Sequence, residues 1–109
     1  MVLLIGGAYQ GKAAYARDVL GLAEDGVARV DVQALMEAPE GETAALEALC
    51  EAYADGALLL EDISCGVVPV DARERALREA SGRFGAYLAR RAARVIRVFC
   101  GMGMVLKDA

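Results

Sequence analysis

The chain has 109 residues, enough for one domain built on a single hydrophobic core. A hydrophobic content of 57% is too high for a disordered chain, and a formal net charge of −4 provides no broad basic surface for nucleic acid. The sequence contains no histidine, which excludes Ser-His and Cys-His catalytic pairs and histidine metal ligands. Three widely spaced cysteines, an N-terminus that reads as a strand and not as a secretion signal, and no long apolar run predict a cytoplasmic protein without a membrane span.

The hydrophobic pattern switches repeatedly between short apolar runs and helical spacing. The predicted strands cover residues 2–5, 27–32, 57–60 and 95–100, with a short edge segment at 105–107. The predicted helices cover residues 11–23, 43–54 and 71–93, the last with Asp71 as its N-cap. This alternation predicts an α/β fold: a P-loop NTPase-like, three-layer domain over residues 1–109, with a mostly parallel sheet of about four or five strands and three main helices.

A glycine-rich segment joins the first predicted strand to the first predicted helix, and it reads Gly6-Gly7-Ala8-Tyr9-Gln10-Gly11-Lys12. The pattern G-x-x-x-x-G-K in this context is typical of a loop whose backbone N–H groups surround a phosphate while the lysine reaches the terminal phosphates. The sequence therefore predicts a nucleotide site for ATP or GTP at residues 6–13. The alternative is a tight turn with an exposed lysine.

Position 13 departs from the pattern, because a serine or threonine should follow the lysine and the residue is Ala13. That hydroxyl normally coordinates Mg²⁺. Nucleotide binding can survive its loss, since a water can occupy the vacant coordination site. Mg²⁺ binding, and with it phosphoryl transfer, is weakened.

With the loop and the segment after the third strand both placed, the chain resembles the bifunctional adenosylcobinamide kinase and adenosylcobinamide-phosphate guanylyltransferase family of cobalamin biosynthesis. The first likeness is the Gly-Gly-Ala run before Gly11-Lys12. The second is the stretch from Glu61 to Pro69, which is similar to the family's Asn-Glu-Val-Gly-x-Gly motif that runs into Val-Pro. The resemblance continues through the following helix and through the segment from Val98 to Lys107. As a whole, the resemblance implies a homo-oligomer and a corrinoid substrate.

A looser likeness joins residues 30–36 to the family strand that reads Val-Asp-Cys-Leu-Thr-Leu-Trp. If these segments correspond, this chain lacks the family segment that precedes the strand. In the family that segment carries the histidine that takes up GMP during guanylyl transfer. A chain without histidine cannot transfer a guanylyl group by that route.

The resemblance also implies roles for single residues. Lys12 would bind phosphates, Asp31 would hold Mg²⁺ directly or through water, and Asp62 would replace a family glutamate near the substrate. Each has an alternative: Asp31 as an exposed strand residue, and Asp62 as an acceptor that orders its loop. The arginines of the last helix, Arg75, Arg78 and Arg83, are interpreted as solvated ion-pairing residues more readily than as ligands.

Three functions remain compatible with these residues. The first is an NTP-dependent kinase, a transferase that phosphorylates a cobinamide-type hydroxyl with Lys12, Asp31 and Asp62 as its catalytic residues. The second is a non-catalytic nucleotide-binding or regulatory relative. The third is a structural subunit whose loop no longer binds nucleotide, which the retention of Gly6, Gly11 and Lys12 disfavours.

Overall fold

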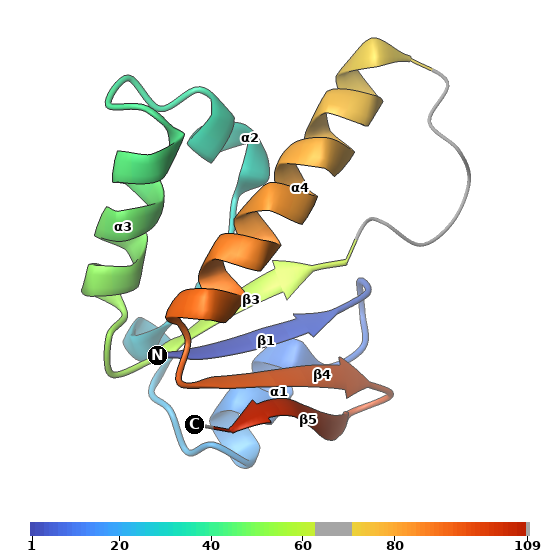
Figure 1. Ribbon diagram of the computed structural model, residues 1–109. Coiled ribbons are helices and arrows are strands. Elements are labelled where there is room, and N and C mark those ends of the chain that lie inside the picture. The colour runs from blue at the N-terminus through green and yellow to red at the C-terminus, as the bar shows by residue number, and fades with distance from the viewer. Residues whose placement is uncertain (63–70, 109) are drawn as a thin grey trace.

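The computed structural model describes residues 1–62 and 71–108. Its centre is a five-stranded sheet in the order β2-β3-β1-β4-β5, which confirms the α/β fold and the mostly parallel sheet. The strands are β1 (Val2–Gly6), β2 (Val27–Arg29), β3 (Ala57–Glu61), β4 (Arg94–Phe99) and β5 (Met102–Asp108). The first four are parallel to one another, and β5 pairs antiparallel with β4 at the edge (Figure 1).

Helices cover both faces of this sheet (Figure 1). They are α1 (Lys12–Asp18), the short α2 (Val32–Met36), α3 (Glu42–Ala52) and α4 (Ala72–Arg91). Helix α1 packs on one face, termed the α1 face, where Ala16 meets Leu4, Leu59 and Ile96. The other three helices pack on the opposite α4 face, where Phe84 and Leu88 meet the second set of strand side chains.

Two predicted elements are shorter than expected. The first helix was predicted to reach residue 23 but ends at Asp18, because the chain turns at Gly21, whose φ is +68°. The Leu22 N–H donates to the Ala16 carbonyl at 3.0 Å across this turn. The second strand was predicted to reach residue 32 but ends at Arg29, since the Asp31 side chain caps a new helix by accepting from the Ala34 N–H.

The last helix has the start that its sequence predicts, and Arg83 forms an ion pair as interpreted. The Asp71 carboxylate accepts from the Glu74 N–H at 2.7 Å and so caps α4. Arg83 donates to both carboxylate oxygens of Glu42 at 3.1 and 3.2 Å, which ties α4 to the first turn of α3. Among the described residues, no helix is long and apolar enough to cross a membrane.

Candidate functional site

The glycine-rich loop (residues 6–13) leaves the carboxyl end of β1, in the middle of the sheet, and enters α1. Gly6 lies so close to β4 that an added Cβ would be 2.4 Å from the Val98 carbonyl oxygen. Gly11 has a φ of +90°, and a Cβ added to it would lie 3.3 Å from the Cα of Gly101. Both glycines are therefore required by the backbone: Gly6 by close approach, Gly11 by a left-handed conformation.

Gln10 fastens this loop to the turn between β4 and β5. Its side-chain oxygen accepts from the Cys100 N–H at 2.8 Å, and its backbone carbonyl accepts from the Gly101 N–H at 2.8 Å. Tyr9, which precedes it, has a φ of +61° and a fully exposed side chain. The loop is thus fixed at Gln10, while Tyr9 projects into solvent.

Lys12 is a buried cation at the start of α1, with an exposed fraction of 4%. Its ammonium donates to the carbonyl of Gly6 at 3.0 Å and to that of Gly7 at 2.7 Å, so the side chain folds back over the loop. Burial lowers the pKa of Lys12 below its ordinary 10.5; the charge of Glu61 raises it, and that of Arg29 lowers it. An ammonium has three donors, and the carbonyls occupy two of them.

A pocket of about 570 Å³ opens beside Lys12 on the α1 face. Its charged lining residues are Lys12, Arg29 at the end of β2, and Glu61 at the end of β3. The loop contributes Ala8, Tyr9, Gly11 and Ala13. The structure therefore brings five of the predicted binding residues together with two that sequence reasoning missed, Arg29 and Glu61.

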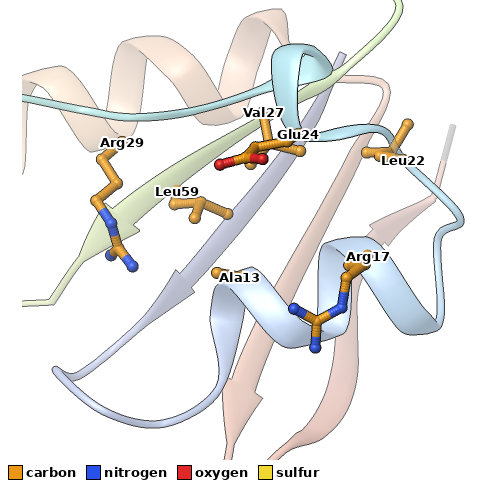
Figure 2. A pocket seen from close by; sticks show the side chains of 7 residues that line it. All are labelled: Ala13, Arg17, Leu22, Glu24, Val27, Arg29 and Leu59. Atoms are coloured by element: carbon orange, nitrogen blue, oxygen red, sulfur yellow. The ribbon is translucent and has the colours of Figure 1, made fainter.

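A second pocket, of about 410 Å³, shares Ala13 and Arg29 with the first and extends along α1 toward β2 (Figure 2). Arg17 of α1 also lines it, and Arg17 is paired with its neighbour Asp18 at 2.8 Å. Leu59 and Val27 form its apolar floor on the sheet. The two pockets are neighbours along the same side of the glycine-rich loop.

Asp62 lies on the other side of the loop, on the α4 face. Its N–H donates to the Gly6 carbonyl at 2.8 Å, and its carboxylate accepts from Arg97 of β4 at 3.3 Å. A smaller pocket of about 230 Å³ is lined there by the remaining predicted loop residues and by side chains of β4. Its lining is Gly6, Gly7, Gln10, Asp62, Arg97, Val98 and Phe99.

Asp31 is not part of the pocket that Lys12 lines. Its carboxylate accepts from the Ala34 N–H at 3.0 Å as the cap of α2, and it lines a neighbouring pocket with Arg29 and Glu61. In the described part of the chain, no group of three histidine, cysteine or acidic side chains could hold a metal ion. With alanine at position 13, the residues around Lys12 offer Mg²⁺ one carboxylate, Glu61, and do not form a complete ligand set.

The fold and the site together define an α/β protein with a lysine-bearing glycine loop at the carboxyl edge of a mostly parallel sheet. Ligands of open α/β sheets bind at this edge. Compared with known proteins, the chain matches no protein-family model and no curated protein sequence. The function must therefore be inferred from the site itself.

Proposed function

We propose that this chain is a P-loop NTPase-like protein that binds a nucleoside triphosphate, ATP or GTP, at residues 6–13. The observation that carries this proposal is the position of Lys12. Its buried ammonium uses two of its three donors on the Gly6 and Gly7 carbonyls, and its side chain lines the same pocket as Ala8, Gly11 and Ala13. A buried cation with an open donor beside a glycine-rich turn is suited to a phosphate.

The backbone of the loop supports the same ligand. Tyr9 and Gly11 both have left-handed conformations, at φ +61° and +90°. Such turns direct backbone N–H groups toward a common centre and form concave anion sites. Because Gln10 holds the loop to Cys100 and Gly101, this conformation is present before any ligand binds.

The resemblance to the adenosylcobinamide kinase and guanylyltransferase family supports a more specific proposal, that the protein acts in the cytoplasm on a corrinoid. A kinase would transfer a phosphoryl group with Lys12 neutralising the developing charge, Asp31 or Glu61 holding Mg²⁺, and Asp62 near the acceptor. Glu61 favours this activity because it lies in the Lys12 pocket. Guanylyl transfer through a histidine is excluded by composition.

A non-catalytic nucleotide-binding or regulatory protein is the second candidate, and specific observations favour it. Ala13 supplies no hydroxyl, Asp31 is engaged as a helix cap, and Asp62 is paired with Arg97. Of the groups that phosphoryl transfer would use for metal or substrate, only Glu61 lies in the Lys12 pocket, and the other three are absent or held by a structural contact. Binding without transfer is the function that these contacts support.

We also propose that the protein is a homo-oligomer whose copies meet at β5. This edge strand exposes apolar side chains that a monomer would leave in water: Met102, Met104, Val105 and Leu106, each at least half exposed, beside Phe99 of β4. An open edge strand with apolar side chains pairs readily with another strand. A second copy of β5 supplies both the hydrogen-bonding edge and matching apolar side chains.

Isothermal titration calorimetry with ATP and GTP, with and without Mg²⁺, tests the binding proposal. The wild type should bind and Lys12→Ala should not. Lys107→Ala is the matched control, because Lys107 also donates to two backbone carbonyls, those of Ala89 and Arg90. It does so near the start of β4, away from the carboxyl ends of the parallel strands where the glycine-rich loop lies. Absence of binding by the wild type would overturn the proposal.

Phosphate transfer to cobinamide, assayed with the binding-competent wild type, separates the two candidates. Transfer that is lost in Glu61→Gln identifies the kinase. Binding without transfer identifies the non-catalytic protein.

A further inference from the structure

Among the described residues, Arg29 lines three neighbouring pockets: the Lys12 pocket, the adjoining pocket along α1, and the pocket beside Asp31. Its side chain is exposed and has no hydrogen-bond or ion-pair partner among residues 1–62 and 71–108. Figure 2 shows its guanidinium extending from the end of β2 toward the end of the pocket where Ala13 lies. Arg29 and Ala13 thus line the same two pockets, and Ala13 is the position whose hydroxyl would coordinate a metal ion in the sequence pattern.

Strand geometry explains why Arg29 reaches the loop. Val27 packs into the core of the α1 face and Ala28 into that of the α4 face, so Arg29, two residues after Val27, points to the α1 face. Its Cα is paired with that of Leu59, two residues before Glu61 on the next strand. The side chains of Arg29 and Glu61 thus emerge on the same face as Lys12.

The charges around this pocket disfavour a divalent cation. Lys12 and Arg29 supply two positive charges and Glu61 one negative charge, so the described lining carries a formal charge of about +1 before a ligand enters. The positive charge of Arg29 contributes to lowering the pKa of Lys12, after the larger effects of burial and of the charge of Glu61. A site of this kind repels Mg²⁺ and attracts a polyphosphate.

We infer that Arg29 takes the place of the magnesium ion in this site, as a second positive charge that binds the polyphosphate chain together with Lys12. The inference rests on the proposed nucleotide binding and specifies that this binding needs no metal. The planar guanidinium can donate two parallel hydrogen bonds to phosphate oxygens. The methyl side chain of Ala13 leaves the guanidinium space that a hydrated metal would otherwise occupy.

Calorimetry on the full chain tests this inference with three ligands, ATP, GTP and inorganic tripolyphosphate, each in EDTA and in Mg²⁺. The wild type should bind in EDTA with a Kd within about threefold of its Kd in Mg²⁺. Arg29→Gln should weaken binding in EDTA by roughly 10- to 100-fold, the loss expected for a charged hydrogen-bonding partner of phosphate. Tripolyphosphate should show the same loss if Arg29 contacts the phosphates and not the base.

Two further variants control for charge and shape. Arg73→Gln removes the same charge from the exposed start of α4 and should change each Kd by less than about twofold. Arg29→Lys keeps the charge but not the planar fork, and should lose less affinity than Arg29→Gln.

The outcomes separate this inference from the proposed function. Wild-type binding that requires Mg²⁺, or equal binding in EDTA by the wild type and Arg29→Gln, overturns the role of Arg29 and leaves nucleotide binding intact. A wild type that binds none of the ligands in either buffer overturns both.

Discussion

Replacing Gly6 with alanine tests whether the glycine-rich loop depends on close approach between β1 and β4. The new Cβ would lie 2.4 Å from the Val98 carbonyl oxygen, which is 0.6 Å shorter than the 3.0 Å below which Cβ contacts are essentially never found. The obstacle is a backbone atom of β4, which is paired on both sides within the sheet, so it cannot rotate away as a side chain could. Forcing extra volume into a packed interior costs about 1–3 kcal/mol. For a domain of this size, a loss of 1 kcal/mol lowers Tm by about 4–8 °C.

Gly82→Ala is the matched control, because it makes the same chemical change where the structure has room. Gly82 is exposed in the middle of α4, and an added Cβ would meet nothing within 4 Å. Alanine is favoured over glycine in a helix interior by roughly 1 kcal/mol, so this variant should be more stable than the wild type. Urea denaturation followed by circular dichroism measures both. A Gly6→Ala variant as stable as the wild type would refute the close contact between β1 and β4.

Three further predictions concern the loop, the last helix and the edge strand. Burial lowers the pKa of Lys12 below its ordinary value of 10.5, and the protonated ammonium is the form that binds an anion. Affinity for ATP should therefore be full below this lowered pKa and should fall as the pH rises through it. Calorimetry across the alkaline range measures this decline, and an affinity that stays constant up to pH 10.5 contradicts it. Asp71→Ala removes the cap of α4 and should cost about 1 kcal/mol in urea denaturation, whereas Asp71→Ser should retain most of it. Met104→Lys places a charge on β5 at a side chain that is 62% exposed, and light scattering should show that the variant forms a smaller particle than the wild type. A wild type that is itself monomeric contradicts the proposed interface.

The sheet and the order of its elements along the chain follow from the hydrophobic pattern because β1 and β3, which lie inside the sheet, are built on the continuous apolar runs at residues 2–5 and 57–60. Leu58, Leu59 and Leu60 are all buried, which requires a helix layer on each face of β3. The ends of elements were predicted less well. Residues 27–32 read as one strand by composition, but the carboxylate of Asp31 competes for the backbone by capping a helix, and this local hydrogen bond ends β2 at Arg29.

The sequence gives only a weak indication of β5 and of its antiparallel arrangement. A short edge segment was predicted at residues 105–107, whereas the strand extends from Met102 to Asp108. Its side chains are mostly exposed, so they lack the alternation that marks a half-buried strand. The tight turn at Cys100 and Gly101, both with positive φ, reverses the chain and sets the pairing with β4.

The choice between Glu61 and Asp62 shows where sequence reasoning about this site falls short. Both acids follow the same apolar run, and the resemblance to a known family directs attention to Asp62. Side chains of a strand alternate between its faces, so Glu61 shares a face with Leu59 and Asp62 with Leu60. In the structure Leu59 packs beneath α1 and Leu60 beneath the other helices.

Lys12 begins α1, so the acid that accompanies it must lie on the same face of β3 as Leu59, which packs beneath α1. This places Glu61 in the Lys12 pocket and turns Asp62 toward Arg97 on the other face. The alternation is visible in the sequence, but all three leucines are apolar and the sequence does not mark which of them lies beneath α1. Three-dimensional packing supplies that assignment, and with it the acid that faces the lysine.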